Sequence, residues 1–397
     1  MKRNFLKRML LGVLGAGLLL AGCAGGAQGT DTDSGTGSGT ETDSDMRSEE
    51  ITTEGHTTPG GQVNRDDIIN SYKYKNPWKK DVKVKAADGK TLTLREVTID
   101  IPGDGTPIEI FQISDMHFNA MYDDEESFVK DSYREWGGNF GDNANIIETF
   151  KRCMNYAAGA DRVILTGDLV NFYSRANYDV MEKYVFQADK NINAALAGIV
   201  IPTPGNHDCT YPDRRSLTQF EKNYRELSSM YSKYGFDIEY TSQVIDERVM
   251  VVVVDNAGRY DANAERYSEK QVEYLRRDIA LAKEKGYVML IFGHIPMPTK
   301  NTDGDKVYID FDSDAYSDDR PNAKAFYELV TNNADVIKGY FCGHNHGDAY
   351  TEIKAKTSEG KPAYIPQYVL ANMSRNLVDG SNSESTGSGN LTRIILK

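Results

Sequence analysis

Four short histidine motifs, each directly after an apolar run, constrain this chain more than any other feature of its sequence. The motifs are Asp115-Met116-His117, Gly205-Asn206-His207-Asp208, Gly293-His294 and Gly343-His344-Asn345-His346. A fifth apolar run ends in Gly167-Asp168. Five of the six histidines lie in these motifs, and only His56 lies outside them. If these motifs act together, the fold must bring segments that are far apart in the sequence close together in space.

Short β-branched runs alternate with longer amphipathic stretches along most of the chain. The runs predict strands over 108–114, 162–165, 199–203, 249–254, 288–292 and 336–341. The stretches between them predict helices over 145–158, 178–197, 217–233, 268–285 and 322–332. We also expect an antiparallel edge strand within 91–101 and a final strand over 391–396. Such alternation is typical of a layered α/β fold with one or two internal sheets.

Each motif follows a predicted strand, so all of them lie at carboxyl ends. In open α/β sheets, ligands bind in the crevice beyond the carboxyl ends of the strands. A single histidine after a strand is more often a packed or capping residue than a functional one. Five coincidences of this kind instead predict one site assembled from distant segments.

The side chains of the motifs form a set that is typical of a metal centre. Histidine is the commonest transition-metal ligand, and carboxylate and amide oxygens complete the set. Seven side chains exceed the needs of one tetrahedral ion, and they divide evenly between two ions if Asp168 bridges them. The predicted ligands are Asp115, His117, Asp168, Asn206, His294, His344 and His346.

The charge of such a centre indicates what it binds. Two divalent ions outweigh two aspartates and a bridging hydroxide, so the centre is positive although the chain is acidic. The neutral side chain of Asn206 matters here, because a third carboxylate would cancel the remaining charge. This predicts an anionic, oxygen-rich substrate such as a phosphate ester.

The motif series D-x-H, GD, GNHD, GH and GH-x-H resembles the calcineurin-like metallophosphoesterases over residues 108–354. The resemblance implies a four-layered α/β sandwich with two central mixed β-sheets flanked by helices. It implies phosphate ester hydrolysis by a metal-bridging hydroxide, with His207 protonating the leaving oxygen and Asp208 orienting His207. It also implies two ligand sets that share one aspartate: Asp115, His117, Asp168 and His346 for one metal, and Asp168, Asn206, His294 and His344 for the other.

Two segments look like the branch related to purple acid phosphatases, namely 112–117 and 293–298. The coloured members of that branch have a tyrosine three residues after the GD aspartate, where it binds ferric iron. This chain has Asn171 at that position, so a purple ferric centre is not expected. The ligand set suits two divalent or trivalent ions of manganese, zinc or iron.

The first 61 residues predict export and anchoring. Residues 1–22 have the layout of a secretory signal peptide, with four basic residues before an apolar run that is short for a membrane-spanning helix. Leu20-Ala21-Gly22-Cys23 resembles the lipobox of bacterial lipoproteins, in which the cysteine carries the lipid. Residues 24–60 are rich in Gly, Ser, Thr and Asp, which predicts a disordered tether. We therefore expect a signal peptide over 1–22, a lipidated tether over 23–61 and a catalytic domain over 62–397, held by its lipid outside the cytoplasm on a bacterial cell membrane.

Charge and cysteine content argue against a general nucleic-acid binder and against a disulfide-rich protein. The formal net charge is −13, and removal of the four basic residues in 1–22 takes it to −17. This charge repels nucleic acid, and no Lys/Arg cluster compensates for it. After Cys23 only Cys153, Cys209 and Cys342 remain, which implies no disulfide framework and favours small buried side chains.

Two further segments bear on specificity. Residues 119–142 are expected to form either a lid over the site or a packed surface loop, and 303–319 to form a solvated acidic loop. Candidate phosphate contacts, which are equally well read as ordinary surface residues, are Tyr211, Arg214 and Arg215.

The predicted substrate is a small phosphate ester, with the membrane reached only through the lipid. Two alternatives stay open. One is a nuclease or an envelope phospholipid or pyrophosphate hydrolase with the same site. The other is a noncatalytic metal-binding surface lipoprotein. The sequence does not indicate an oligomeric state.

Overall fold

A computed structural model describes residues 79–397, except for 104, 128, 132, 134–142, 211–216, 258–265, 301–305, 308–319 and 375–388. All described residues fall in the compact unit Thr57–Lys397. Cys23, His56, the predicted signal peptide and the predicted tether lie outside the described residues. Within the described part, no helix is long and apolar enough to cross a bilayer.

The first sheet has six strands in the order β1-β2-β14-β3-β4-β5. Strands β3, β4 and β5 run parallel, while β14 pairs antiparallel with β3 and parallel with β2. The sheet is therefore mixed. Its strands are β1 (Lys79–Lys85), β2 (Thr91–Ile99), β14 (Asn390–Leu396), β3 (Ile108–Ile113), β4 (Arg162–Thr166) and β5 (Val200–Thr203).

The second sheet also has six strands, in the order β12-β13-β11-β8-β7-β6. Its four central strands are parallel, and an antiparallel strand closes each edge. The strands are β12 (Ala349–Lys356), β13 (Pro362–Val369), β11 (Ile337–Cys342), β8 (Val288–Phe292), β7 (Val249–Val254) and β6 (Tyr240–Ile245). A small two-stranded ribbon of β9 (Thr299–Lys300) and β10 (Lys306–Val307) pairs with neither sheet.

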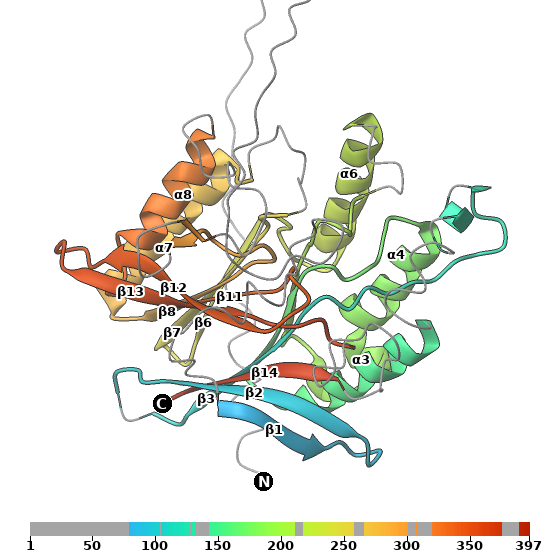
Figure 1. Cartoon of the computed structure of the whole chain (residues 1–397), viewed down its shortest axis with the longest axis horizontal. Helices are drawn as coiled ribbons and strands as arrows, with labels where there is room; N and C mark the ends of the chain where they lie inside the picture. Colours follow the sequence, from blue (N-terminus) through green and yellow to red (C-terminus); the bar gives the residue numbers. More distant parts are fainter. Residues whose placement is uncertain are drawn as a thin grey trace, which may run out of the picture. The chain divides into compact units, whose positions relative to one another are not determined.

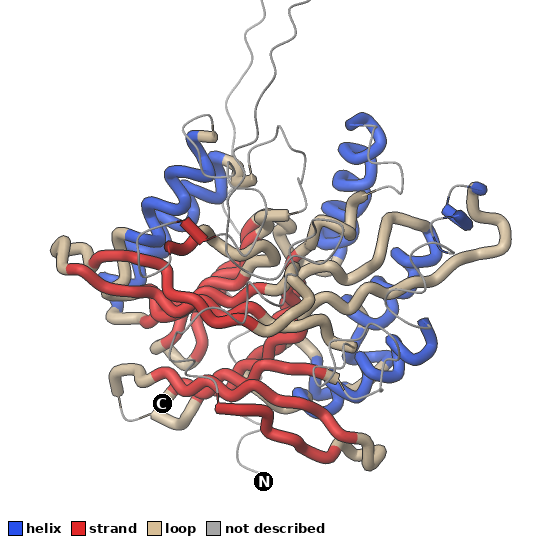
Figure 2. The backbone as a smooth tube through the Cα atoms, viewed as in Figure 1, coloured by secondary structure: helices blue, strands red, loops and turns tan. Residues whose placement is uncertain are grey.

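Helices cover the outer face of each sheet (Figure 1). The first sheet packs against α3 (Asn143–Ala157), α4 (Arg175–Met181) and α6 (Leu217–Lys233). The second packs against α7 (Glu269–Lys285) and α8 (Pro321–Thr331). Figure 2 shows the strands gathered between these two groups of helices. The result is the expected four-layered α/β sandwich with two central mixed sheets.

Strand β7 shows how the sequence produces these layers. All six of its residues are buried, and successive side chains point to opposite faces of the strand. Met250, Val252 and Val254 pack toward α7 and α8, whereas Val249, Val251 and Val253 pack between the sheets. A strand that is buried on both faces reads as a continuous apolar run, which is why this segment has no polar position.

Helix α7 has clear signals at both ends. Ser268 caps the first turn, and Gln271 returns a side-chain hydrogen bond to the cap backbone. Gly286 ends the helix with a φ of 73°, in the left-handed region that favours glycine. These residues set where the helix begins and ends.

Three expectations need correction. Strand β2 is not at an edge, because Lys79–Lys85 forms β1 outside it. The predicted helix over 178–197 is broken: α4 runs into a π-helical segment (Glu182–Phe186), followed by α5 (Ala188–Asn191) and a 3-10 turn (Ala194–Leu196). The sequence also did not predict β1, β6, β12 or β13, whose segments mix polar and apolar residues.

Candidate metal centre

The five motifs lie at the carboxyl ends of five strands. Three follow β3, β4 and β5 in the first sheet, and two follow β8 and β11 in the second. Hydrogen bonds tie the loops together within each sheet: the amide of His117 donates to the carbonyl of Asp168 over 2.9 Å, and the amide of Gly343 donates to that of His294, also over 2.9 Å. Between the sheets, the amide of His344 lies 3.1 Å from both carboxylate oxygens of Asp115. The amide of His207 also donates to Oδ1 of Asp168 over 2.9 Å, so the five loops form one structure.

The backbone of these loops is held in an uncommon conformation. Seven non-glycine residues in the described part of the chain have positive φ, and five of them are predicted ligands. Such residues cost about 1–3 kcal/mol each and persist only where the surroundings enforce them, as they do at functional sites. The five are Asp115 (54°), His117 (50°), Asp168 (48°), His344 (72°) and His346 (56°).

The glycine that opens four of the motifs has a steric reason in each case. A Cβ atom on Gly205 would collide with the carboxylate and amide of Asp168, and one on Gly343 would collide with Ser114 and Asp115. A Cβ on Gly167 would lie 2.5 Å from Nδ1 of His294, and one on Gly293 would lie 2.5 Å from the hydroxyl of Tyr340. Three of these glycines thus let a predicted ligand approach the backbone.

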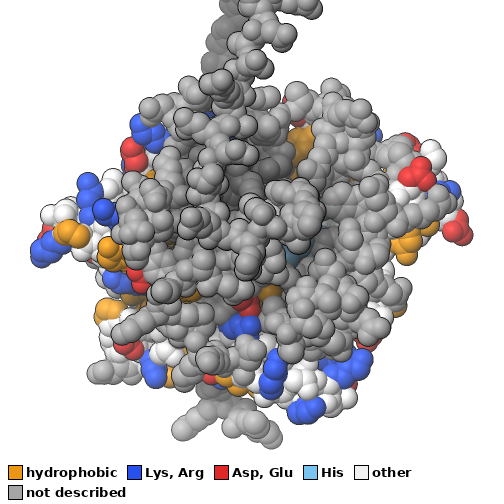
Figure 3. All heavy atoms as spheres, viewed as in Figure 1, with side chains coloured by type: hydrophobic (Ala, Val, Ile, Leu, Met, Phe, Trp, Pro, Cys, Tyr) orange, Lys and Arg blue, Asp and Glu red, His pale blue; other side chains and the backbone are white. Residues whose placement is uncertain are grey.

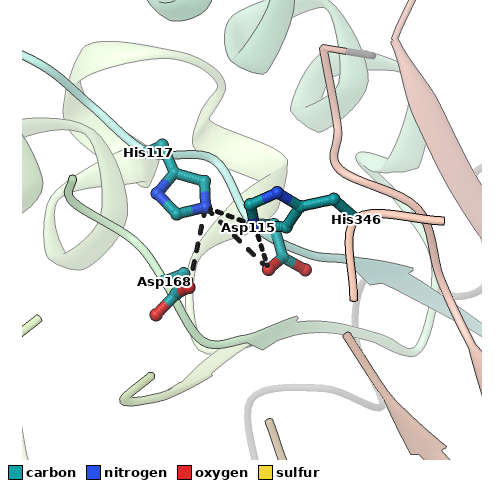
Figure 4. A group of neighbouring side chains, drawn as sticks. All are labelled: Asp115, His117, Asp168 and His346. Atoms are coloured by element: carbon teal, nitrogen blue, oxygen red, sulfur yellow. Dashed lines mark hydrogen bonds and ion pairs between the residues drawn. The ribbon is translucent and has the colours of Figure 1, made fainter. Parts of the chain in front are cut away.

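One group of side chains is gathered from both sheets, and we call it the first ligand group: Asp115, His117, Asp168 and His346. Each offers one ligand atom, and these atoms lie within 4.8 Å of one another. Figure 4 shows the rings of His117 and His346 directed toward each other and toward the carboxylates. Nε2 of His117 lies 3.0 Å from Nε2 of His346 and 3.6 Å from Oδ2 of Asp168.

A second ligand group shares Asp168 and contains Asn206, His294 and His344. The ligand atoms of Asp168, His294 and His344 also lie within 4.8 Å of one another. Oδ1 of Asn206 lies 3.1 Å from Nε2 of His294 and 3.0 Å from Nδ1 of His344. The structure thus brings all seven predicted ligands together, in two groups with one aspartate in common.

Burial shapes the protonation of these groups. It holds the pKa of His117 well below the ordinary value despite the nearby Asp168 carboxylate, so this ring is neutral, as a metal ligand requires. Burial alone would also lower the pKa of His294, but the charge of Asp168 raises it to about 10. Metal ions would therefore compete with the proton on His294.

The seven side chains suit metal ions in type and in placement. Asp115, His117, Asp168 and His294 are almost wholly buried, and nitrogen and oxygen donors of this kind suit zinc, manganese and iron. His344 and His346 are half-buried, which leaves one side of the centre open. In Figure 3 a few histidine atoms are visible to the right of the centre of the face viewed.

His207 lies beside the first ligand group, with its ring centroid 4.9 Å from that of His117. Its Nδ1 lies 2.7 Å from the carbonyl of Asn171, so the neutral ring carries its proton on Nδ1 and donates it there. Nε2 is then the atom that takes up a second proton.

Asp208 differs from the expectation that it orients His207. Its carboxylate accepts the amides of Val170 (2.8 Å) and Gly205 (2.6 Å), and burial together with the charge of Asp168 raises its pKa well above the ordinary value. Asp208 therefore fixes the backbone of two motifs, and the carbonyl of Asn171 orients the histidine.

Only part of the predicted specificity segments can be located. The beginning of 119–142 docks onto the start of α4, where the amide of Ala176 donates to Glu125 and the hydroxyl of Tyr122 donates to Asp179. This contact agrees with a packed loop for that portion. Tyr211, Arg214 and Arg215 lie outside the described residues, as does 303–319 apart from Lys306–Val307.

Comparison with known families gives the same assignment as the geometry. Residues 108–348 match the family described as calcineurin-like phosphoesterase, which is more than half of the chain. The chain belongs to this family. No curated protein sequence matches the chain.

Two solved structures are similar to this chain at low sequence identity. One is a dimetal phosphatase from Danio rerio, with 14% identity and a TM-score of 0.36, covering 67% of this chain and 87% of that chain. The other is described as a 5′-nucleotidase from Staphylococcus aureus in complex with alpha-ketoglutarate, with 10% identity and a TM-score of 0.34. That match covers 70% of this chain and 57% of the other.

Two supporting residues were missed in the sequence, although both lie beside motifs. Ser114 donates its hydroxyl to Oδ2 of Asp115 over 2.5 Å, and Asn171 supplies the carbonyl for His207. The serine follows the same strand as Asp115, so a search for any polar residue after a buried strand would have found it. The carbonyl of Asn171 has no sequence signal, because every residue has one.

Proposed function

We propose that this chain hydrolyses phosphate esters with two metal ions, one held by each ligand group. The observation that carries the proposal is the pair of buried ligand groups that share Asp168. Family membership supports the reaction class. Bound there, paired ions would acidify a water molecule and neutralise phosphate oxygens.

The residues of the chain support this chemistry in distinct ways. Asp168 offers one carboxylate oxygen toward each group: Oδ2 lies 3.6 Å from His117, and Oδ1 lies 3.3 Å from His294. Protonated on both ring nitrogens, His207 would hold Nδ1 on the Asn171 carbonyl and donate from Nε2 to a leaving oxygen. The half-buried position of this ring allows a substrate to reach it.

A chromogenic phosphomonoester and phosphodiester test this proposal. We expect the purified chain, loaded with manganese, zinc or iron in turn, to hydrolyse at least one of them. The preferred ester would then name the substrate class. Metal binding without hydrolysis of either ester would favour the noncatalytic alternative.

We propose further that Cys23 carries a lipid that anchors the chain outside the cytoplasm, and that residues 24–61 act as the tether. The signal-peptide layout and the lipobox support this. In bacterial cells, we expect the chain to fractionate with membranes and Cys23→Ser to release it into the soluble fraction. Membrane retention of Cys23→Ser would contradict a lipid anchor.

A further inference from the structure

Two buried asparagines outside the motifs hold the loops that carry His294 and Asp115. Asn256 follows β7 and is 1% exposed, and Asn372 follows β13 and is 4% exposed. Buried amides are expensive unless their donors and acceptors are used. Asn256 forms hydrogen bonds with the loop that carries His294, and Asn372 donates a hydrogen bond to the loop that carries Asp115.

Asn256 forms hydrogen bonds with the peptide groups around His294. Its Oδ1 accepts the amides of His294 and Ile295, each over 3.0 Å. Its Nδ2 donates to the carbonyl of Ile295 over 2.7 Å and to the hydroxyl of Tyr340 over 3.0 Å. One side chain thus fixes both ends of Ile295 and the amide of His294.

Asn372 forms a hydrogen bond with the left-handed turn at Asp115. Its Nδ2 donates to the carbonyl of Asp115 over 2.7 Å, and the backbone amide of the next residue, Met373, donates to the carbonyl of Ser114 over 3.0 Å. Its Oδ1 accepts the amide and the hydroxyl of Ser374, both over 2.9 Å, which fixes the side chain in turn. Asn390 donates to the backbone carbonyl of Asn372 over 2.8 Å and ties this segment to β14.

These contacts act on different ligand groups. His294 belongs only to the second ligand group and Asp115 only to the first, whereas Asp168 belongs to both. We propose that Asn256 and Asn372 are positioning residues, each of which sets the affinity of one metal ion: Asn256 through His294, and Asn372 through Asp115. This inference rests on the two-metal function proposed above.

The test compares Asn256→Ser and Asn372→Ser in the full chain, each as the control for the other. Zinc content and zinc affinity are measured by titration and elemental analysis. Loss of a residue that orients a metal ligand typically weakens binding 10–100-fold. We expect the wild-type chain to bind two zinc ions tightly, and each variant to bind one tightly and the other 10–100-fold more weakly.

Histidine modification then identifies the ion that is weakened. His344 and His346 are both half-buried, and each belongs to a different ligand group. With one equivalent of zinc, diethylpyrocarbonate and mass spectrometry should show His346 protected in Asn256→Ser and His344 protected in Asn372→Ser. Loss of the same ion in both variants, or retention of both ions in both variants, would overturn the inference.

Amide hydrogen exchange without metal separates this inference from the proposed function. Exchange at His294 and Ile295 should accelerate in Asn256→Ser alone, and exchange around 114–117 should accelerate in Asn372→Ser alone. Accelerated exchange in the two variants, together with no hydrolysis by the wild type, would contradict the proposed function but support the positioning roles. Unchanged exchange in both variants would contradict the positioning roles, whether or not the wild type hydrolyses an ester. If a serine variant does not fold, Asn256→Asp and Asn372→Asp keep the size of the side chain while removing the Nδ2 donor. Zinc binding and histidine modification then decide, because the carboxylate in Asn256→Asp would still accept the amides of His294 and Ile295.

Discussion

At the scale of single residues, the site is built as much by backbone as by side chains. Five predicted ligands have left-handed backbone, and three motif glycines leave room for a ligand to approach. A glycine in these motifs is therefore part of the ligand geometry. The same reasoning predicts that adding one methyl group to such a glycine disturbs a ligand that lies far away in sequence.

Gly205→Ala is the sharpest case, because its Cβ would collide with the carboxylate of Asp168. We expect this variant to lose both metal ions while keeping its secondary structure, as measured by elemental analysis and circular dichroism. Gly198→Ala is the control, since its Cβ meets nothing within 4 Å but its φ is 70°. The control should lose about 1–2 kcal/mol of unfolding free energy from backbone strain and keep both ions. Full metal content in Gly205→Ala would show that the contact does not matter.

The sequence indicated the side chains that the structure gathers into the two ligand groups, but it did not indicate the residues that support them. Histidine and aspartate after strands are visible because the residue types are chemically distinctive. Asn256 and Asn372 also follow strands, but asparagine is common in loops and signals nothing by itself. What distinguishes these two is burial and full hydrogen bonding, which only the fold reveals.

At the scale of elements, burial of nearly every residue made six of the strands easy to predict. The six strands expected from apolar runs all form, within one or two residues of the expected bounds. Strands β6 and β12 lie at edges of the second sheet, and several of their residues are partly exposed. Their sequences carry less apolar signal, and their pairing partners are what make them strands. The prediction of one continuous helix over 178–197 was wrong, because regular apolar spacing does not distinguish an α-helix from a helix interrupted by a π-helical segment.

The layer between the sheets predicts where truncation costs most. Ile110 on β3 is wholly buried there, and Ile110→Ala should cost about 2–5 kcal/mol of unfolding free energy. Val244 on the edge strand β6 is 39% exposed, and Val244→Ala should change it by no more than about 0.5 kcal/mol. Urea denaturation measures both. Equal losses in the two variants would mean that the space between the sheets is not a packed core.

At the scale of the whole described unit, buried polar contacts join the two sheets. Nε2 of Gln112 on β3 donates to the carbonyl of Cys342 on β11 over 2.9 Å, just before both motifs begin. The hydroxyl of Thr203 on β5 donates to the carbonyl of Val254 on β7 over 2.8 Å. These contacts hold the carboxyl ends of the two sheets together, so that ligands from both can meet.

The three cysteines of this unit provide a probe of its integrity and its pH dependence. Cys153, Cys209 and Cys342 are buried, and burial raises the pKa of Cys153 to about 12. Iodoacetamide at pH 9 should label none of them in the folded chain and all three in urea, as read by mass spectrometry. Prompt labelling of the folded chain would contradict this burial.

The same thiol sets a pH trend in stability. The pKa of Cys153 is about 8.5 in the unfolded chain, whereas burial raises it to about 12 in the folded chain. The unfolded chain therefore binds fewer protons between these values, and the unfolding free energy falls as pH rises. Between these two pH values, this thiol alone lowers the unfolding free energy by about 1.4 kcal/mol per pH unit. Urea midpoints at successive pH values, compared with those of Cys153→Ala, isolate its share.

The central claim is that two metal ions share Asp168 and together hydrolyse a phosphate ester. The direct measurement is the rate at which Asp168→Ala hydrolyses the ester that the wild type turns over, with bound metal counted in the same samples. We expect no bound metal and no turnover in Asp168→Ala, whereas His207→Ala should keep two ions and lose about 10²–10⁴-fold in rate. Wild-type turnover by Asp168→Ala would contradict the two-metal account.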